Sequence, residues 1–471
     1  MKLYKIRITT YKALLSISLT LLFSCDLFLD VAPPKTELAT DLVFDNNSTA
    51  NAAITSIYAQ MATVNGTPLS NMVWLSGLSA DEFTNYATDQ RITAFYTNSL
   101  SPSDALVASY FWTPYYNIIY QTNAIIEGLS KSTGVSDIVK KQIIGEAKFI
   151  RAFYHFYLTG FYGDIPLVTS SDYRINATLS RSPQIDVYKQ IVSDLLDARE
   201  MLNNNYVGAD GTTTSTERVR PNEKVAAALL ARVYLYTKNY EKAEDEATTV
   251  IDDSRYTLTS NLNNTFLKNS AEAIWQLQPF TGAATTFATK FVLITAPTTG
   301  LDKSIVLNSS ILNLFDSNDL RYANWVGKIT VSGQTHYFPN KYKVTGVNTT
   351  EYDMVIRLAE LHLIRAEARI HQDDIKNGLA DLNVLRKRAN VEEYDVETIT
   401  DDPFLLVERE RQRELFSEGH RWFDLRRTGQ IDEVMTIFAP SKGAQWRAGS
   451  ALYPIPQTER NSNPNLSQND Y

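Results

Sequence analysis

The sequence predicts a mainly α-helical protein, in which a tetratricopeptide-like helical scaffold carries an irregular binding subdomain of loops and short strands. The first observation behind this fold is the helical spacing of apolar residues over residues 51–258. The second is a pair of two-helix patterns on either side of a long segment that lacks helical period. With 471 residues and 44% apolar side chains, the chain is long enough to bury a sizeable core.

Residues 1–24 have the layout of a signal peptide. Four basic side chains and no acidic one precede an apolar run at residues 13–23. As a helix this run would rise about 16 Å, roughly half the thickness of a hydrocarbon core, so it is too short to span a membrane. We therefore predict that residues 1–24 direct export and are then removed.

Cys25, the only cysteine in the sequence, follows this run directly, in Leu22-Phe23-Ser24-Cys25. The arrangement resembles a bacterial lipobox, whose cysteine is acylated, with palmitate for example, and becomes the first mature residue. Several acyl chains, at about 0.8 kcal/mol per buried methylene, would hold the protein on a membrane permanently. Residues 25–48, which include Pro33 and Pro34, then form an extended tether.

Residues 49–258 form the predicted N-terminal helical part. Helix starts are indicated at Thr113-Pro114, at Ser182-Pro183 and after Pro221. Residues 225–251 match the tetratricopeptide pattern, in which small side chains let two paired helices approach closely. The matching residues are Leu230, Ala231, Tyr234, Ala243, Ala247 and Val250.

Residues 259–352 form the predicted binding insert. Clusters of Gly, Thr and Asn and short alternating pieces, such as residues 273–277, indicate loops and short strands there. Residues 353–471 return to helix and end in a tail, with a second and looser tetratricopeptide match around Ala368 and Ala380. Irregular segments on a rigid scaffold are common places for ligand contacts, so we expect the ligand at the insert.

The sequence holds no motif of a common enzyme class. It lacks a glycine-rich phosphate loop, a nucleophile elbow and paired histidines at ligand spacing. The five histidines are scattered singly, and a lone histidine is more often structural than ligating. We therefore expect no catalytic residues, no metal site and no cofactor.

Charge argues against nucleic acid as a partner. The 45 Lys and Arg face 53 Asp and Glu, for a net charge of −8, so no basic field exists to hold phosphates. Residues 408–427 are dense in charge, but Glu410 and Glu414 alternate with arginines at distances that permit i,i+4 pairing on a helix. We interpret this segment as scaffold, with Leu415 and Phe416 on its buried side.

Three blocks of motifs follow each other along the chain. They are Gly145 to Phe153 with Tyr162 to Leu167, then Arg365 to Ala368 with Asn383 to Ala389 and Glu408 to Arg427, and finally Leu452 to Pro456 with Asn463 to Asn469. Together with the lipobox they resemble the SusD/RagB family of outer-membrane nutrient-binding lipoproteins of Bacteroidota. The blocks are fold motifs, so they say little about the ligand.

The resemblance implies a lipoprotein on the outer face of the outer membrane that acts as a lid on a SusC-like TonB-dependent transporter. Such a protein captures oligosaccharide and delivers it as the lid closes, without chemistry on the ligand. Two alternatives stay open. One is a RagB-like lid that binds oligopeptide, and the other is a surface tetratricopeptide scaffold without a nutrient ligand.

A sugar site needs a flat aromatic platform beside side chains that bond pairs of hydroxyls. Two segments outside the regular helices combine both. From residues 81–96 we predict the ligand-binding residues Asp81, Asn85, Tyr86, Arg91 and Tyr96. From residues 319–342 we predict Tyr322 and Trp325, with Trp325 as the ring that stacks on a sugar. The other tryptophans are assigned to the core or the scaffold: Trp74, Trp112, Trp275, Trp422 and Trp446.

Overall fold

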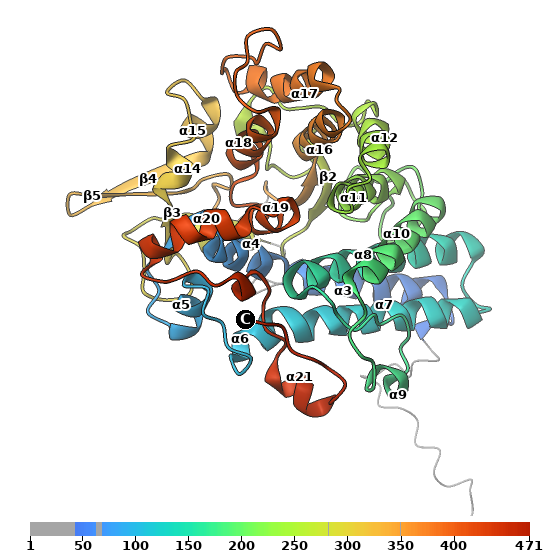
Figure 1. Ribbon diagram of the computed structural model, residues 1–471. Helices are drawn as coiled ribbons and strands as arrows, with labels where there is room; N and C mark the ends of the chain where they lie inside the picture. Colours follow the sequence, from blue (N-terminus) through green and yellow to red (C-terminus); the bar gives the residue numbers. More distant parts are fainter. Residues whose placement is uncertain (1–42, 63–67, 281, 349) are drawn as a thin grey trace, which may run out of the picture. The chain divides into compact units, whose positions relative to one another are not determined.

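The computed structural model describes residues 43–62, 68–280, 282–348 and 350–471 (Figure 1). The predicted signal peptide, the lipidation site Cys25 and residues 25–42 of the tether lie outside these residues. Helices dominate the described part and its strands are short, so the mainly α-helical prediction is confirmed. Among the described residues, none of the helices combines the length and the apolar character needed to cross a bilayer.

The N-terminal helical part packs long helices side by side around one buried helix. These helices are α3 (Asn47–Ala62), α4 (Pro68–Ser79), α7 (Thr113–Lys131), α8 (Asp137–Tyr162) and α10 (Gln184–Met201). Helix α8 lies between α7 and α10 (Figure 1) and is buried almost continuously from Gly145 onward. Its Arg151 bonds Asp194 of α10 through two nitrogens and Asn123 of α7 through a third, which ties the three helices together.

Two of the predicted helix starts are displaced in the structure. Helix α10 begins at Gln184 and Pro183 is its N-cap, because Ser182 pairs with Ile165 in an isolated bridge. Helix α7 does not start afresh at Thr113. The short helix α6 (Ala105–Val107) and the π-helix η2 (Ala108–Trp112) run into it without a break.

Both predicted tetratricopeptide helix pairs are present, but Ala380, which was placed at the contact of the second pair, is exposed, whereas Ala368 is buried. The first pair consists of α11 (Glu223–Tyr236) and α12 (Tyr240–Ile251), and the second of α16 (Leu358–His371) and α17 (Ile375–Arg388). Although the insert separates the pairs in sequence, α12 packs directly on α16 (Figure 1). Ala243 and Ala247 of α12 are fully buried, as the pattern requires. The pairs therefore form one continuous helical stack.

The insert carries three two-stranded antiparallel sheets together with its neighbours. They pair β1 (Phe83–Asn85) with β3 (Ile305–Leu307), β2 (Ala273–Leu277) with β6 (Asp353–Arg357), and β4 (Val326–Val331) with β5 (Gln334–Pro339). Short helices α13 (Thr286–Phe291), α14 (Ser309–Leu312) and α15 (Leu320–Trp325) link them. The strand predicted at residues 273–277 is confirmed. It is buried on both faces, because Trp275 packs edge-on against Phe149 and Phe153 of α8.

The C-terminal part runs back over the N-terminal helices. It comprises α18 (Pro403–Leu415), α19 (Arg421–Thr428), α20 (Ile431–Phe438) and α21 (Gln457–Ser462), and the remaining short helices of the chain are α5 (Gln90–Tyr96) and α9 (Tyr173–Asn176). Asn469, near the end of the chain, donates to the carbonyl oxygens of Tyr162 and Tyr453. The tail is therefore part of the folded core.

An aromatic cluster joins helices from both ends of the chain. We define it as Phe95, Phe111, Phe161, Phe423 and Tyr453, all at most 3% exposed. Phe161 of α8 lies at its centre, with ring centroids 4.7 Å from Phe111, 4.9 Å from Phe423 and 4.8 Å from Tyr453. Rings of this kind bury about 150–250 Å² each, so the cluster contributes much apolar surface to the core.

An ionic cluster lies around α18. We define it as Arg321, Arg357, Arg388, Glu272, Glu410 and Glu414, whose side chains are at most 5% exposed. Glu414 accepts from Arg388 at 2.5 Å, Arg357 at 2.6 Å and Arg321 at 3.2 Å. The segment contributes to the scaffold, but pairing within the helix is limited to Glu410 with Arg413, three residues on, at 3.5 Å. The other partners come from α17, β6 and α15, because both glutamates face the interior.

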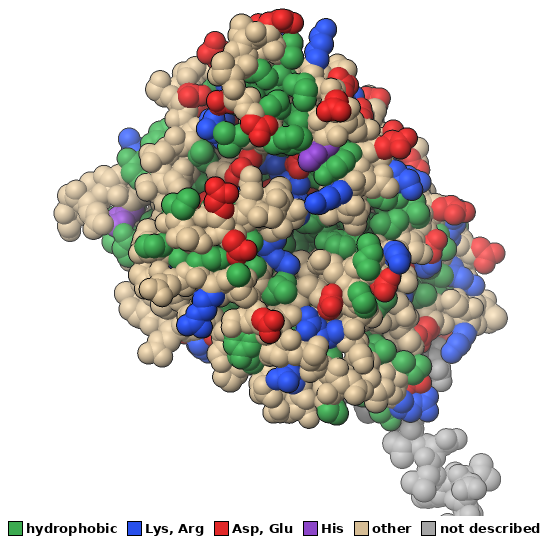
Figure 2. All heavy atoms as spheres, viewed as in Figure 1, with side chains coloured by type: hydrophobic (Ala, Val, Ile, Leu, Met, Phe, Trp, Pro, Cys, Tyr) green, Lys and Arg blue, Asp and Glu red, His purple; other side chains and the backbone are tan. Residues whose placement is uncertain are grey.

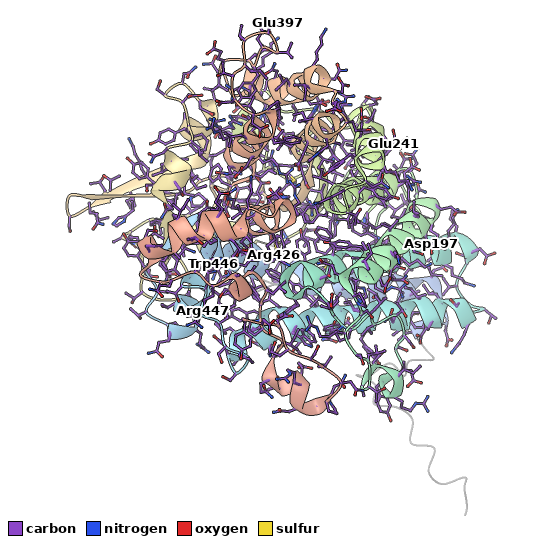
Figure 3. The ribbon with its side chains drawn as sticks, in the orientation of Figure 1. Asp197, Glu241, Glu397, Arg426, Trp446 and Arg447 are labelled. Carbon is purple, nitrogen blue, oxygen red and sulfur yellow. The ribbon has the colours of Figure 1, made fainter. Side chains whose placement is uncertain are left out.

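The face shown in Figure 2 carries acidic and basic side chains intermixed with apolar ones, without a block of one sign. Asp197 on α10, Glu241 on α12 and Glu397 beyond α17 lie toward the outer edge of the helical part (Figure 3). The fields of charges of both signs on one face oppose each other at a distance, and salt screens exposed charges beyond about 8–10 Å.

Candidate functional site

Strand β1 and helix α5 position most of the residues predicted to bind ligand. Strand β1 pairs with β3, and the Tyr86 amide donates to the Ser304 carbonyl at 2.7 Å just beyond it. Asp89 then caps α5 by accepting from the Arg91 amide at 2.9 Å. We call Asn85, Tyr86, Arg91 and Tyr96 the β1 surface, because this one stretch of chain presents all four.

Arg91 is the most open side chain of the β1 surface, at 53% exposed. Its guanidinium bonds the Asp89 carboxylate through Nε at 3.0 Å and Nη2 at 2.6 Å. The hydrogen bonds from Arg91 lower the pKa of Asp89, so the carboxylate stays ionised. Arg91 and Asp89 thus present a donor and an acceptor to solvent, an arrangement that suits adjacent hydroxyl groups.

Tyr86 and Tyr96 are half-buried and each has a polar neighbour. The Tyr86 ring meets His336 of β5 edge-on, with centroids 5.6 Å apart. Burial raises the pKa of Tyr96, whose hydroxyl bonds Thr84, and the Lys442 ammonium stands 5.1 Å from its ring centroid. Lys442 occupies one face of Tyr96, so Tyr86 is the better placed of the two rings to meet a ligand.

Tyr322 is exposed but does not belong to the β1 surface. It interacts with Tyr337, whereas Tyr86 contacts His336, the preceding residue of β5. Successive side chains of a strand point to opposite faces, so Tyr86 and Tyr322 lie on opposite sides of the β4–β5 hairpin. One sugar ring cannot contact both tyrosines.

The structure corrects the expectation for Asp81. Its side chain is buried and accepts from Arg421 of α19 through both oxygens, each at 2.8 Å. Burial alone would raise the pKa of Asp81, but the charge and hydrogen bonds of Arg421 outweigh it and lower the pKa. A carboxylate that is fully engaged inside the protein is not available to a sugar.

The expectation that Trp325 stacks on a sugar is also corrected. Its side chain is fully buried, and its indole nitrogen donates to the Leu262 carbonyl at 3.0 Å. Lys341 and Arg388 lie 4.9 and 5.7 Å from the ring centroid. The Trp325 ring therefore packs against the ionic cluster in the protein interior. The tryptophans that were assigned to the core, Trp74, Trp112 and Trp275, are buried as predicted, and so is Trp422, which was assigned to the scaffold.

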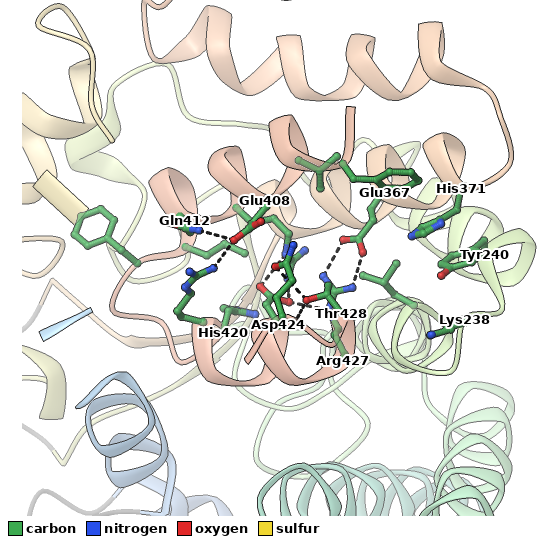
Figure 4. A pocket seen from close by; sticks show the side chains of 18 of the residues that line it. Lys238, Tyr240, Glu367, His371, Glu408, Gln412, His420, Asp424, Arg427 and Thr428 are labelled. Atoms are coloured by element: carbon green, nitrogen blue, oxygen red, sulfur yellow. Dashed lines mark hydrogen bonds and ion pairs between the residues drawn. The ribbon is translucent and has the colours of Figure 1, made fainter. Parts of the chain in front are cut away.

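A cavity of about 220 Å³ opens between the helical stack and the C-terminal helices. We call it the α18 cavity. Figure 4 shows Lys238, Tyr240 and His371 on one side of it and Glu408, Gln412 and His420 on the other. These residues come from α12 and the turn before it, from α16, and from α18 with the loop that follows. The cavity is thus built from segments far apart in the sequence.

The floor of the α18 cavity is a lattice of paired charges. Asp424 of α19 accepts from Arg411 at 2.9 and 3.1 Å and from Arg427 at 2.8 Å. Arg427 continues to Glu367 of α16 at 2.5 and 2.8 Å, and these pairs are drawn in Figure 4. Because every carboxylate there has a guanidinium partner, the floor carries little net charge.

Two further titratable groups of the cavity are neutral near pH 7. Burial raises the pKa of Glu82 to about 8, so its carboxyl keeps a proton. Burial lowers the pKa of His420 to about 4, so its imidazole stays unprotonated. Both groups touch the cavity without adding charge to it.

Three rings line the side of the cavity near the helical stack. Tyr240 and His371 are stacked almost parallel, with centroids 3.9 Å apart. The Phe404 ring lies 4.4 Å from His371, and Phe404 is 41% exposed. The described residues hold no group of three His, Cys, Asp or Glu arranged to bind a metal ion.

Sequence reasoning missed the α18 cavity. Tyr240, His371 and Phe404 lie on three different helices, and no spacing in the sequence relates them. The one available signal was the charge-dense segment 408–427, which supplies Glu408, Arg411 and the α19 residues of the floor. It was interpreted as scaffold only.

Two family models match the chain. Residues 27–235 match a SusD-like family described as "Starch-binding associating with outer membrane", and residues 322–471 match the SusD family model named for SusD and RagB. The two matches do not overlap and together cover about three quarters of the chain.

The chain belongs to the SusD/RagB family.

Curated relatives agree with this SusD/RagB assignment. Two SusD-like proteins of Formosa agariphila, P25 and P2, are 23% identical over 274 residues and 30% identical over 222 residues. The matches take in 54% and 46% of this chain and 49% and 41% of those proteins, so the chain spans about half their length or less. A third, P38, is 24% identical over 97% of both chains.

Solved structures show the same fold. A SusD superfamily protein from Bacteroides vulgatus has a TM-score of 0.78 at 22% identity, over 91% of this chain and 99% of that one. A laminarin-binding SusD-like protein has a TM-score of 0.74 at 22% identity, over 91% and 100%. Surface glycan-binding protein A from Bacteroides fluxus has a TM-score of 0.74 at 20% identity, over 90% and 98%.

Proposed function

We propose that this SusD/RagB protein binds oligosaccharide at the cell surface and delivers it to a SusC-like TonB-dependent transporter, on which it acts as a lid. The observation that carries the proposal is the match to a family described as starch-binding and associated with the outer membrane. Two proteins of the same fold are a laminarin-binding protein and a surface glycan-binding protein, which supports carbohydrate as the ligand class. The ligand leaves unchanged, so the protein is not an enzyme.

In this proposal the acylated Cys25 holds the protein on the outer face of the outer membrane. Several acyl chains make the attachment permanent, and the predicted tether is shortened to residues 25–42, because Phe44 is buried and α3 begins at Asn47. This segment would let the folded part swing between an open and a closed position. Closure over the transporter would be favoured by bound oligosaccharide, because a ligand shifts an equilibrium toward the state it binds better.

The β1 surface is the proposed oligosaccharide site. Tyr86 offers a ring for the apolar face of a sugar, while Arg91 with Asp89 and the side chain of Asn85 offer donors and acceptors for hydroxyls. Tyr96 contributes its remaining face. Tyr322, on the other side of the β4–β5 hairpin, would contact a longer chain that wraps around the hairpin.

Isothermal titration calorimetry of the folded protein tests the site. We expect starch or β-1,3-glucan oligosaccharides to bind, and Tyr86→Ala and Arg91→Ala each to weaken binding about tenfold, as loss of a central contact does. Arg174→Ala is the matched control, because Arg174 pairs with Asp172 on α9 in the same way as Arg91 pairs with Asp89 on α5. Equal affinities of Arg91→Ala, Arg174→Ala and wild type would contradict this site.

Purification from detergent-treated outer membranes tests the partner. The wild-type protein should copurify with a TonB-dependent transporter in fixed proportion. The Cys25→Ser variant should fold normally but should no longer be found in the membrane fraction. Copurification together with binding of oligopeptides, and no glycan binding, would replace oligosaccharide with peptide as the cargo. Absence of any transporter would favour the scaffold without a nutrient ligand.

A further inference from the structure

We propose that the α18 cavity is a second ligand site, which binds a single neutral sugar ring apart from the β1 surface. The inference rests on the proposed function in one respect only, namely that carbohydrates reach this protein. The volume of the cavity limits the size of the ligand. A cavity of about 220 Å³ is smaller than the roughly 300–1,000 Å³ of pockets for drug-sized ligands, so it holds one ring and a few waters.

The ion pairs on the cavity floor limit the charge of the ligand. The Arg427–Glu367, Arg427–Asp424 and Arg411–Asp424 pairs balance the charges of the floor, while Arg411 Nη1 is buried without a hydrogen-bond partner among the described residues and is free to donate to a ligand oxygen. A charged ligand that displaced a member of one of these pairs would leave a buried charge uncompensated, which is costly. A neutral ligand leaves the lattice intact. The paired charges of the floor are therefore compatible with a neutral ligand.

Hydrogen-bonding groups without protein partners point to hydroxyls. Gln412 donates to Glu408, but its Oε1 has no partner among the described residues. Gln430 accepts from Thr428, whereas its Nε2 has no partner in the described part of the chain, and the same holds for the Tyr240 hydroxyl. Acceptors and donors therefore both line the cavity. A hydroxyl group is both, so a polyhydroxylated ring matches this mixture.

The aromatic side of the cavity supplies the apolar contact. Phe404 keeps 41% of its surface exposed beside His371, although a phenylalanine gains free energy from burial. The parallel stack of Tyr240 and His371 fixes the imidazole next to it. A sugar presents the complement, with C–H groups on its ring face and hydroxyls at its rim.

Two groups of the cavity would also accept an anion: the unpartnered Arg411 Nη1, which a neutral hydroxyl oxygen serves equally well, and Lys238. Lys238 is the weaker of the two. It is exposed at the edge of the cavity and forms no ion pair within the described residues. An exposed ammonium is strongly hydrated and screened by salt, so it discriminates weakly. We therefore assign the site to neutral rings and let a charged ring serve as the contrary probe.

Saturation-transfer NMR and calorimetry on the full mature chain test the inference. The probes are the methyl glycosides of glucose, galactose and mannose, and of glucuronic acid. We expect at least one neutral glycoside to bind and Phe404→Ala to weaken it about tenfold, because truncation of an aromatic anchor costs more than 1 kcal/mol. Gln412→Ala should weaken it as well.

Leu405→Ala is the matched control. Leu405 follows Phe404 on α18, is 36% exposed and does not line the cavity, so its truncation should leave glycoside affinity unchanged. Equal melting temperatures of both variants would show that Phe404→Ala acts on binding and not on folding.

Three results would overturn the inference. They are no binding of any neutral glycoside, equal affinity in Phe404→Ala and wild type, or tighter binding of the glucuronide that Lys238→Ala abolishes. Oligosaccharide binding by the wild type, measured separately, keeps this failure distinct from failure of the proposed function. If the protein binds oligosaccharide but no monosaccharide, the result contradicts the assignment of the α18 cavity and leaves the proposed function intact.

Discussion

The aromatic cluster and the ionic cluster both hold distant parts of the chain together, the first by ring packing and the second by ion pairs. Both connect the N-terminal helices or the insert to the C-terminal helices across long distances in sequence. Phe161 does so through ring contacts of 4.7 to 4.9 Å with three other rings. Glu414 does so by accepting hydrogen bonds from three arginines on three different elements.

The difference lies in how each cluster responds to change. Packed rings lose stability in proportion to the surface and volume removed. Buried charges are balanced against one another, so removal of one group leaves its partners uncompensated in a low-dielectric interior. The ionic cluster should therefore be the less tolerant of single substitutions and the more sensitive to pH.

The largest effect is expected for Glu414→Gln. It keeps the shape of the side chain but removes the negative charge that faces Arg321, Arg357 and Arg388. We expect a loss of about 3–5 kcal/mol in the free energy of unfolding, measured by urea denaturation followed by circular dichroism. Glu397→Gln, an exposed position, is the control. A loss below 1 kcal/mol would show that water or relaxation compensates the arginines.

A smaller effect is expected for His420→Gln, and only in acid. Burial lowers the pKa of His420 to about 4 from an ordinary value of 6.5. Between these values the unfolded chain takes up a proton that the folded protein does not, so stability falls as the pH drops from 6.5 to 4. The substitution should remove up to about 3 kcal/mol of this loss. Melting temperatures of both proteins at pH 7 and 4.5 measure it, and parallel shifts would refute the assignment.

The smallest effect is expected for Phe161→Leu in the aromatic cluster. The substitution keeps the site apolar and removes part of one ring, so we expect a loss of about 1–2 kcal/mol. Since no charge is involved, the loss should be the same at pH 5 and pH 8 by urea denaturation. A pH-dependent loss would mean that the two clusters are coupled.

Much of the fold could be predicted from the sequence, because its evidence is local. The spacing of Ala243 and Ala247 indicated a close helix pair, and residues 273–277 indicated a strand. Helix starts were less certain: Pro183 acts as the N-cap of α10, and Thr113 continues an existing helix. Those details depend on neighbours such as Ile165 that lie outside the local sequence.

The site was harder to predict, because exposure is a property of the whole fold. Asp81 and Arg91 look equally available in the sequence, yet Arg421, 340 residues away, engages Asp81 inside the protein. The sequence suggested that Trp325 is an exposed platform, but in the structure three cationic side chains and the Leu262 carbonyl enclose its ring. The β1 surface retains the residues whose partners are local, such as Arg91 with Asp89.

The contacts of the tail have a consequence for how the protein is made. Tyr453 bonds Ser79, 374 residues earlier, and Asn469 bonds the Tyr162 backbone, 307 residues earlier. A ribosome that adds about 5–20 residues per second needs roughly half a minute to a minute and a half for a chain of this length. Throughout that time the first helices lack their final partners. These contacts form only once residue 469 has left the ribosome, which leaves the nascent chain open to chaperones until then.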